Sequence, residues 1–565
     1  MPSPLPHAFL DAYRGRLFEG EWPSLPELFA ITTERHGSRQ CFTVYDPDRV
    51  SLSYAEAAAY IGRVAARLEA DGVLPGDRVV VTGKNGPEWA VAWFAALHAG
   101  AIVVPIDAQL RKEETANLIA AADAKAAFVD EEKYDEVKAG GFSLAAIYSL
   151  SRKKASYIYD VAAPEPIARV KRSVEETAAI LFTSGTTGTP KGVMLSHRNL
   201  VADCFLAQAN LGLFPTDVFY ALLPLHHSYT MLAVFIEAIS VGAEVVFGRS
   251  MATSRILHDL KEAKITMLLG VPLLFNKVLA GIMKGIREKG PIVSGVLGFL
   301  MAVSGLIKKT TGVNPGKSLF GAVLDKASLR TIRICISGGG PLAPSVFRRY
   351  NQLGIDFIQG YGLTETSPIL TLNPVEHYKE TSVGKLVPGV QARLLEPDAE
   401  GRGEIAVKGP MVMQGYFRAP EETAKVFTED GWFKTGDVGW IDDENYVYLT
   451  GRAKNLIVTE GGKNVYPEEI EERFQLFEEV DQVLVRGFAP DASSAAEEIE
   501  AIVHPTDDFA KGRDWAEVAR RVEEIVATIN EGLLPYQRIA RTTVLAEALE
   551  MTTTKKVKRF AVAKT

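Results

Sequence analysis

Helical and strand-like hydrophobic patterns alternate along most of the chain. Ser53 and Glu56 form a capping-box pattern, and apolar residues at helical spacing follow them. A short apolar strand at 78–82 comes next, and the order repeats with a helix from Pro87 and a buried strand at 101–104. Alternating helices and short apolar strands predict parallel sheets with helices on their faces.

The same alternation continues farther along, with further strands expected at 217–222, 243–247, 267–269 and 333–337. The sequence therefore predicts an α/β fold with a large N-terminal domain of parallel α/β subdomains over residues 1–452. Subdomain boundaries are expected near 170 and 345. Loops at the strand ends are where ligands should bind.

After Arg452 the pattern changes to a smaller unit with strands near 482–485 and 498–503. A strongly amphipathic helix follows, with one apolar stripe made of Trp515, Val518, Ala519, Val522, Ile525, Val526 and Ile529. Residues 453–565 are therefore predicted to form a separate, mobile C-terminal α+β lid.

One uncharged segment, 290–307, is long enough to be a candidate transmembrane helix. Basic residues flank it on both sides: Arg287, Lys289, Lys308 and Lys309. Its position inside an α/β domain favours a buried or amphipathic insert. Shallow contact with a membrane surface is the alternative, and a true span ranks last.

Composition excludes several classes of protein. At 565 residues the chain is too long for one core, and a net charge of −8 gives no basic stripe, so nucleic acid is not an expected partner. Cys41, Cys204 and Cys335 lie far apart, which argues against disulfides and structural zinc. The first twenty residues lack a signal-peptide pattern. We expect a cytoplasmic protein, with peripheral attachment to the inner membrane left open.

The loop at 183–192 has the chemistry to bind a polyphosphate. Glycines let backbone N–H groups approach an anion, hydroxyls add donors, and a lysine adds charge. The spacing differs from a Walker A loop, because Lys191 precedes Gly192 instead of a serine or threonine. The candidate phosphate-binding residues in this loop are Thr183, Ser184, Gly185, Thr186, Thr187, Gly188 and Lys191.

Further motifs follow this loop in a fixed order, at 337–341, 359–366, 403–404, 415–417, 431–437, 451–455 and 554–559. Together they resemble the adenylate-forming superfamily, which includes acyl-CoA synthetases, firefly luciferase and the adenylation domains of peptide synthetases. The chain is most similar to bacterial long-chain fatty acyl-CoA synthetases. The resemblance implies ATP, Mg²⁺ and CoA as cofactors and a place in fatty acid metabolism.

The implied reaction has two steps. A carboxylate attacks the α-phosphate of ATP and releases pyrophosphate, and a thiol then displaces AMP from the acyl adenylate. Such an enzyme must align the reactants and neutralise phosphate charge, with little covalent work of its own.

The resemblance assigns roles to individual residues. Thr364 and Glu365 lie on the segment that meets the α-phosphate and Mg²⁺, and Thr183 and Glu365 are the expected metal ligands. Tyr361 offers a ring to adenine, and Asp437, beside Arg452, offers a carboxylate to the ribose. The complete expected AMP-binding set adds Gly338, Gly339, Gln359, Gly360 and Gly362.

The C-terminal lysine motif supplies the remaining catalytic group. Lys556 fits the family pattern of Lys, an aliphatic residue, any residue and Arg, while Lys555 is the competing candidate. Lys454 matches the hinge about which the lid rotates between the two steps. Gly461 and Gly462 would then let the pantetheine arm of CoA pass close to the backbone.

The acyl pocket is expected to involve His227, Met231, Gly338 and Gly362, with His227 as a catalytic gating residue. A structural role for this histidine is the alternative. We therefore predict an ATP-dependent acyl-CoA synthetase for a medium- or long-chain fatty acid. The alternatives are a fatty acyl-AMP ligase loading a carrier protein, an aromatic-acid CoA ligase, and a non-catalytic nucleotide-binding protein. Monomer and homodimer both stay open.

Overall fold

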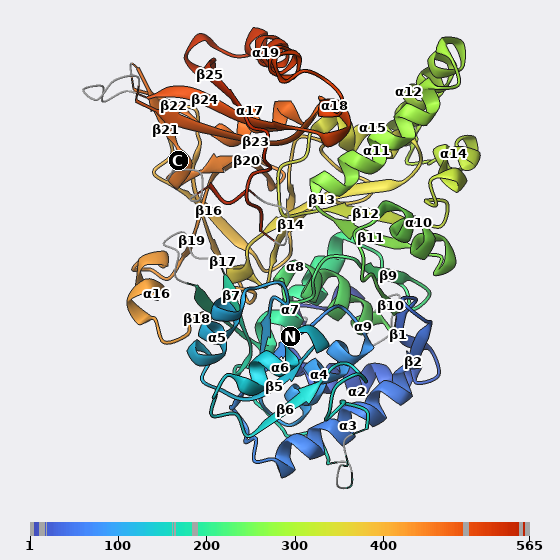
Figure 1. The fold of residues 1–565 in the computed structure, drawn as a ribbon, viewed down its shortest axis with the longest axis vertical. Helices are drawn as coiled ribbons and strands as arrows, with labels where there is room; N and C mark the ends of the chain where they lie inside the picture. Colours follow the sequence, from blue (N-terminus) through green and yellow to red (C-terminus); the bar gives the residue numbers. More distant parts are fainter. Residues whose placement is uncertain are drawn as a thin grey trace.

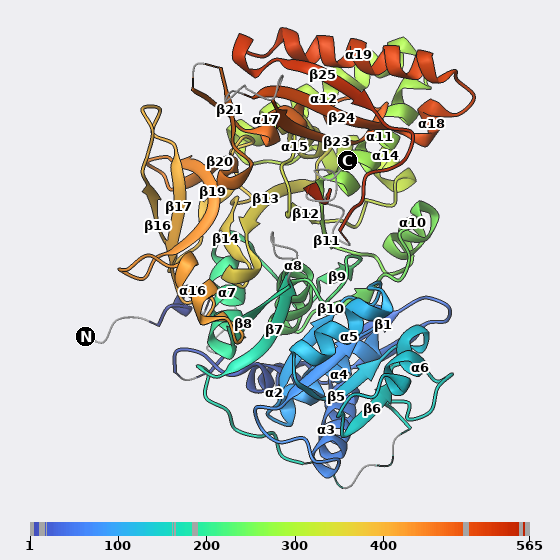
Figure 2. The same cartoon turned by 60° about the vertical axis from the view of Figure 1, so that its left-hand side comes forward.

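The computed structural model describes residues 5–10, 17–18, 20–160, 162, 165, 167–183, 190–460, 462–489, 497–552 and 557–559. A mixed α/β N-terminal part carries a smaller C-terminal α+β domain at one end (Figures 1 and 2). The expected α/β fold class with a smaller C-terminal domain is confirmed.

The smaller of the two large sheets has seven strands in the order β18-β8-β7-β4-β3-β5-β6. The strands from β7 to β6 are parallel, and β8 and β18 add to the edge in antiparallel pairing. The bounds are β3 Arg78–Thr82, β4 Ile102–Ile106, β5 Ala124–Val129, β6 Ala146–Ser149, β7 Thr177–Thr183, β8 Lys191–Ser196 and β18 Gly415–Tyr416.

The larger sheet has thirteen strands in the order β16-β17-β19-β20-β15-β14-β13-β12-β11-β9-β10-β1-β2. Its parallel part runs from β13 to β1. The bounds are β1 Gln40–Val44, β2 Val50–Ser53, β9 Val218–Ala221, β10 Glu244–Phe247, β11 Met267–Gly270, β12 Ile334–Ser337, β13 Asp356–Gly362, β14 Ile369–Leu372, β15 Gly384–Leu386, β16 Gln391–Leu395, β17 Gly403–Lys408, β19 Phe433–Ile441 and β20 Tyr446–Arg452.

Helices cover these sheets. The helices of the first half are η1 Ala8–Leu10, α2 Leu25–His36, α3 Tyr54–Ala70, α4 Pro87–His98, α5 Lys112–Ala121, α6 Glu131–Ala139, α7 His197–Ala207, η2 Gln208–Asn210, α8 Ser228–Thr230, the π-helix η3 Met231–Ile236 and α9 Glu237–Val241. Those that follow are α10 Thr253–Glu262, α11 Pro272–Arg287, α12 Pro291–Thr311, α13 Gly316–Leu319, α14 Gly321–Lys326, α15 Pro344–Gln352, η4 Thr364–Thr366 and α16 Pro420–Val426.

Alternating side chains place the strands between separate cores. On β3, Val79 and Val81 face the main core, while Val80 faces a second core under α5 and α6. Trp93 and Phe235 meet edge to face at the centre of the main core, with ring centroids 5.5 Å apart. Burial on both faces explains why these strands read as unbroken apolar runs.

Strands from distant parts of the chain share each sheet. β1 and β2 precede β3, yet they belong to the larger sheet, and β18 returns from residue 415 to the smaller one. Both sheets therefore draw strands from either side of residue 170. The domain boundaries at 170, 345 and 452 stay predictions.

The C-terminal domain is built on its own small core. A three-stranded sheet of β23 Val480–Phe488, β24 Glu498–Pro505 and β25 Ile539–Val544 packs against α17 Pro467–Phe474 and α19 Trp515–Glu531. The hairpin of β21 Ile457–Thr459 and β22 Lys463–Val465 precedes it, and η5 Ala453–Asn455, α18 Asp507–Ala510 and η6 Pro535–Gln537 complete the domain.

The apolar stripe of α19 is confirmed except at its start. Val518, Val522, Ile525, Val526 and Ile529 are buried against the small sheet. Trp515, at the start of the predicted apolar stripe, is 40% exposed. The indole belongs to the first residue of the helix, before the buried face begins at Val518.

The C-terminal domain contacts the N-terminal part through α11 and the loop after β12. Asp481 pairs with Lys277 at 3.2 Å, and Glu478 pairs with Arg287 at 2.6 Å. Gln475 reaches the glycine-rich loop, where its Nε2 donates to the carbonyl oxygen of Pro341 at 3.0 Å. The lid is thus joined directly to the segment expected to bind adenine.

The segment at 290–307 forms α12, which is amphipathic rather than buried. Met301, Ser304 and Lys308 are its buried residues, and Ile292 and Phe299 are 81% and 68% exposed. Of the two forms expected for the insert, the buried one is therefore wrong. The helix projects from the rim of the molecule (Figure 1).

A buried carboxylate should make the stability of the C-terminal domain depend on pH. Burial raises the pKa of Glu500, but hydrogen bonds from Arg541, Arg486 and Thr543 outweigh it and lower the pKa from 4.5 to about 2. The folded state thus binds fewer protons than the unfolded state in this range. The stabilisation is complete above the unfolded pKa and is lost as the pH falls toward about 2.

We expect Glu500→Gln to cost about 3 kcal/mol at pH 7, since each pKa unit corresponds to about 1.4 kcal/mol. The unfolding temperature of this variant should also change less than that of the wild type between about pH 5 and pH 3. Glu498→Gln, an exposed site on the same strand, is the control. Equal pH dependence in the wild type and Glu500→Gln would contradict the assignment.

Candidate active site

The end of β13 carries the central residues of the candidate site. β13 lies parallel to β12, with Ser337 opposite Gln359, so the glycine-rich loop that begins at Gly338 starts beside the segment 360–366. Carboxyl ends of adjacent parallel strands are the usual place for a ligand in such a sheet. Two clusters of polar side chains meet this segment.

The first cluster joins Tyr361, Asp437 and Arg452. The Tyr361 hydroxyl donates to Oδ2 of Asp437 at 2.6 Å, and Nε of Arg452 lies 2.7 Å from Oδ1. Asp437 on β19 and Arg452 on β20 are direct cross-strand partners. Burial, and then the Asp437 charge, raise the pKa of Tyr361 well above its ordinary value, which keeps the phenol protonated as a donor. The cluster holds a charge-balanced carboxylate in a fixed orientation, suited to accepting hydroxyl donors.

The second cluster is centred on Glu365. Its Oε1 accepts a hydrogen bond from the Tyr416 hydroxyl at 2.9 Å. Nζ of Lys191 lies 5.1 Å from the centre of the Tyr416 ring and forms an ion pair with Glu422. Lys191 is thereby held at the base of the phosphate loop, close to Glu365.

The phosphate loop joins β7 to β8. Thr183 and Lys191 are paired across these antiparallel strands, and the Thr183 hydroxyl donates to the carbonyl oxygen of Lys191 at 3.4 Å. Five residues predicted to bind phosphate lie outside the described residues: Ser184, Gly185, Thr186, Thr187 and Gly188. The strand pairing nevertheless brings the two ends of the loop together.

Thr364 connects the site to the segment that contains His226 and His227. Its hydroxyl lies 3.2 Å from the Ser228 hydroxyl, and Ser228 follows His227 at the start of α8. The His226 and His227 rings are 4.1 Å apart, and His226 Nε2 lies 3.7 Å from Asp107. Burial lowers the pKa of His226 to about 3, so that ring is neutral at pH 7.

Two glycines of the site lie close to neighbouring groups. A Cβ on Gly338 would lie 3.0 Å from the Tyr229 ring, whose hydroxyl donates to the carbonyl oxygen of Ile336 at 3.0 Å. A Cβ on Gly362 would lie 1.5 Å from the carbonyl oxygen of Pro368. Close packing thus excludes a side chain at Gly362, while at Gly338 the Tyr229 ring would have to shift by a few tenths of an ångström.

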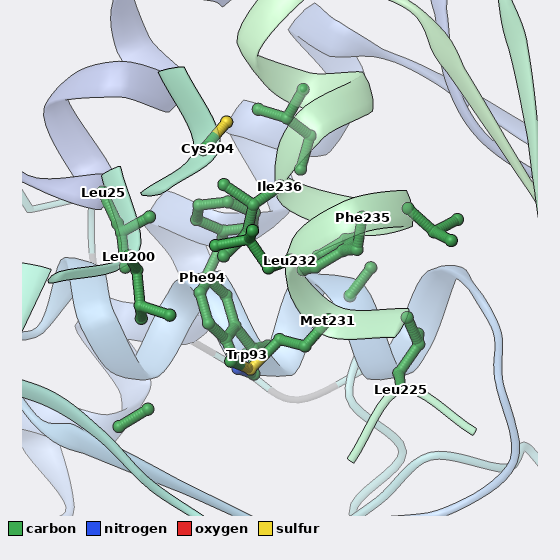
Figure 3. Close-up of a cluster of buried hydrophobic side chains, with 14 of the residues drawn as sticks. Leu25, Trp93, Phe94, Leu200, Cys204, Leu225, Met231, Leu232, Phe235 and Ile236 are labelled. Atoms are coloured by element: carbon green, nitrogen blue, oxygen red, sulfur yellow. The ribbon is translucent and has the colours of Figure 1, made fainter. Parts of the chain in front are cut away.

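Met231 occupies a different environment from the one expected for a pocket residue. It is fully buried in the main core, where it lies beside Trp93 and near Leu225 (Figure 3). Its part in an acyl pocket stays a prediction, as do those of His227, Gly338 and Gly362.

The residues present fit a magnesium ion that is shared with substrate phosphates. Among the described residues, no group of three His, Cys, Asp or Glu side chains could hold a metal. Mg²⁺ typically binds one or two carboxylates together with phosphate oxygens. The single carboxylate of Glu365 is consistent with this mode of coordination. Mg²⁺ bound there would neutralise phosphate charge.

The C-terminal motif is held beside the lid core. Arg559 donates to both carboxylate oxygens of Glu471, at 2.6 and 2.7 Å. Met551 and Val557 form an antiparallel bridge. Lys555 and Lys556 lie between these two bridged residues in the sequence but outside the described residues, so the catalytic assignment stays a prediction.

Lys454, the candidate hinge residue, lies near Arg452 of the candidate site and near Arg559 of the C-terminal motif. Desolvation, followed by the charges of Arg452 and Arg559, lowers the pKa of Lys454. Gly462 has a φ of +70° in the β21–β22 turn, with open space where a Cβ would stand, while Gly461 lies outside the described residues. The hinge and CoA roles remain predictions.

Three residues of the site were not assigned from the sequence. Tyr416 binds Glu365, Ser228 meets Thr364, and Tyr229 packs on Gly338. Tyr416 lies inside the motif at 415–417, and Ser228 and Tyr229 directly follow the candidate gating residue His227. Only the fold reveals which candidate site residue each one contacts.

Known proteins share this arrangement of elements. The model of the AMP-binding enzyme family matches residues 29–417, well over half of the chain. The chain belongs to the AMP-binding enzyme family. A long-chain-fatty-acid–CoA ligase from Mycobacterium bovis is 33% identical over 470 residues, covering 78% of this chain and 75% of the relative. A feruloyl-CoA synthase from an Amycolatopsis species is 29% identical over 497 residues, covering 86% and 89%.

Solved structures of the family agree in fold. The crystal structure of ATP-bound MatB from Rhodopseudomonas palustris has a TM-score of 0.76 and 28% identity, covering 96% of this chain and 99% of that one. This AMP-binding enzyme is therefore an ATP-dependent ligase of the acyl- or aryl-CoA type. The Tyr361 and Glu365 clusters hold fixed dipoles and charges of the kind that such chemistry needs.

Tyr416→Phe tests the link between β18 and Glu365. Loss of one hydrogen bond to a carboxylate should cost about 1.5 kcal/mol, or about tenfold in kcat/KM for adenylation. Pyrophosphate exchange at varied ATP concentration measures it. Tyr448→Phe, which removes a hydroxyl 3.1 Å from Asp442 on another part of the sheet, is the matched control. Similar losses in both variants would refute a specific role for Tyr416.

Proposed function

We propose that the chain is an acyl-CoA synthetase that activates a medium- or long-chain fatty acid with ATP and Mg²⁺ and transfers the acyl group to CoA. One observation carries the proposal. The short segment 361–365 makes contacts with the fixed carboxylate of Asp437 on one side and with Tyr416 beside the phosphate loop on the other. A nucleotide laid along this segment would place its ribose and its phosphates at opposite ends.

The residues then divide the work of the first step. Asp437 accepts hydrogen bonds from ribose hydroxyls, and Arg452 balances its charge. Lys191 and the loop it anchors hold the leaving phosphates. Thr364 and Glu365 lie where the α-phosphate and the attacking carboxylate meet. The gain comes from alignment and from charge stabilisation rather than from a covalent enzyme intermediate.

The preference for a fatty acid is supported by the 33% identity to a long-chain-fatty-acid–CoA ligase. A second candidate substrate is an aromatic acid, which the similarity to a feruloyl-CoA synthase favours. The Tyr229 ring against Gly338 would suit either acid.

A pyrophosphate-release assay separates these candidates. We would compare acetate, hexanoate, decanoate, palmitate, benzoate and ferulate, each with and without CoA. The proposal predicts a peak at decanoate or palmitate, with AMP and acyl-CoA as products only when CoA is present. Activity on benzoate or ferulate alone would replace the fatty acid with an aromatic acid. Release of ADP would overturn the adenylation mechanism.

A further inference from the structure

The surface of α12 and the turn after it carries an unusual concentration of exposed apolar side chains. Among the described residues, seven of the eighteen large apolar side chains that are exposed lie between 292 and 319: Ile292, Val293, Val296, Phe299, Leu306, Val313 and Leu319. A contiguous exposed apolar patch on a soluble domain usually marks a contact surface.

Five apolar side chains of α12 form a stripe, and four of them are exposed while Val303 is half-buried. Ile292, Val296, Phe299, Val303 and Leu306 follow each other at spacings of four and three residues, which keeps them on one side of a helix. No residue in the N-terminal half of α12, from 291 to 300, is buried.

The opposite side of α12 is anchored in the domain. The Lys308 ammonium lies 2.6 Å from both Asp356 and Asn351 in a buried contact, and Met301 and Ser304 are buried as well. The helix packs on α15 through this side. The exposed stripe is therefore held in a fixed orientation.

Positive charge surrounds the stripe. The region 284–320 holds six basic residues and one acidic residue, in a chain whose net charge is −8. Lys284, Lys289 and Lys309 are exposed and have no ion pair within the described part of the chain. Lys309 follows Leu306 by three residues, which places it next to the C-terminal end of the stripe.

We propose that α12 docks on an anionic membrane surface, with the stripe from Ile292 to Leu306 inserted among the lipid headgroups and the lysines bound to lipid phosphates. An apolar stripe flanked by basic residues is the pattern of a helix that lies in the interface plane. The surface is independent of which acid the enzyme activates.

Two other occupants fit the structure less well. α12 meets the length and hydropathy of a membrane span. A span would require Lys308 to leave Asp356 and both ends of the helix, joined to α11 and α13, to separate from the domain. A second copy related by a two-fold axis would bring the basic ends of the two helices together, which like-charge repulsion opposes.

Vesicle sedimentation of the full-length protein tests the proposal. The probes are phosphatidylcholine vesicles with and without phosphatidylglycerol, at low salt. The combined variant Ile292→Ser, Val296→Ser, Phe299→Ser should bind anionic vesicles about tenfold or more weakly than the wild type. Leu74→Ser removes an apolar side chain that is 64% exposed elsewhere on the surface and should bind normally.

A second variant isolates the charge contribution. Replacing Lys284, Lys289 and Lys309 with glutamine should reduce the preference for anionic over neutral vesicles by about fivefold per lysine. Unchanged unfolding temperatures and pyrophosphate exchange would show that each variant is folded. The proposal fails if the wild type does not sediment with anionic vesicles or if the serine variant binds as well as the wild type. If sedimentation velocity shows a dimer that the serine variant abolishes, the stripe binds a second copy of the chain and the membrane proposal is overturned.

Discussion

Replacing Lys556 with alanine is expected to lower the rate of acyl-adenylate formation by about 10²- to 10³-fold. A lysine placed at the reacting carboxylate and α-phosphate stabilises charge in the transition state, and loss of one such group has effects of about this size. The rate of thioester formation from supplied acyl-AMP should be unchanged, because that step does not require charge stabilisation by Lys556 at the α-phosphate. Pyrophosphate exchange measures the first step, and acyl-CoA formation from acyl-AMP measures the second.

Two neighbouring lysines serve as controls for this prediction. Lys558 lies 3.3 Å from Glu550 within the lid, so Lys558→Ala should leave adenylation near the wild-type rate. Lys555→Ala should do the same if Lys556 is the catalytic residue. Full adenylation by Lys556→Ala together with its loss in Lys555→Ala would move the role to Lys555.

Replacing Gly362 with alanine is expected to destabilise the N-terminal part by about 3 kcal/mol or more. The added Cβ would lie 1.5 Å from the carbonyl oxygen of Pro368, a backbone atom that accepts the Leu363 N–H at 3.0 Å, so the backbone between β13 and β14 would have to shift. The same shift would displace Tyr361 and Thr364, so adenylation should fall together with the unfolding temperature.

The chain offers a matched glycine for comparison. Gly281 lies on α11 with open space at the position of an added Cβ. Gly281→Ala should therefore be neutral or raise stability by about 0.5–1 kcal/mol, through helix propensity and reduced freedom of the unfolded chain. If Gly362→Ala melts at the wild-type temperature, the close packing at Pro368 is not a constraint in solution.

Local features of the fold followed directly from the sequence. The Ser53 capping box is present, with the Ser53 N–H donating to Glu56 at 2.8 Å, and the strand predicted at 78–82 matches β3. The next strand was predicted to end at Val104. β4 instead runs through Pro105 to Ile106, because its register with β3 continues to that residue. Tertiary pairing there outweighs the local signal of a proline.

Long-range partners could not be read from the sequence in the same way. Tyr416 and Glu365 are both in motifs, but they meet because β18 pairs with β8 at the edge of the smaller sheet. The face of α12 that is buried depends on Lys308 finding Asp356, 48 residues later. Such contacts are set by register and topology, which residue patterns do not encode.

The interleaved sheets also bear on how the chain folds as it is synthesised. β1 pairs with β10, whose residues follow those of β1 by about 200 positions. At about 5–20 residues per second, a ribosome needs roughly 10–40 s to deliver that partner. During this interval β1 has only β2 as a paired strand, so the nascent chain exposes an unpaired strand edge. The order of strands in the larger sheet thus makes early synthesis the stage at which a chaperone would be most useful.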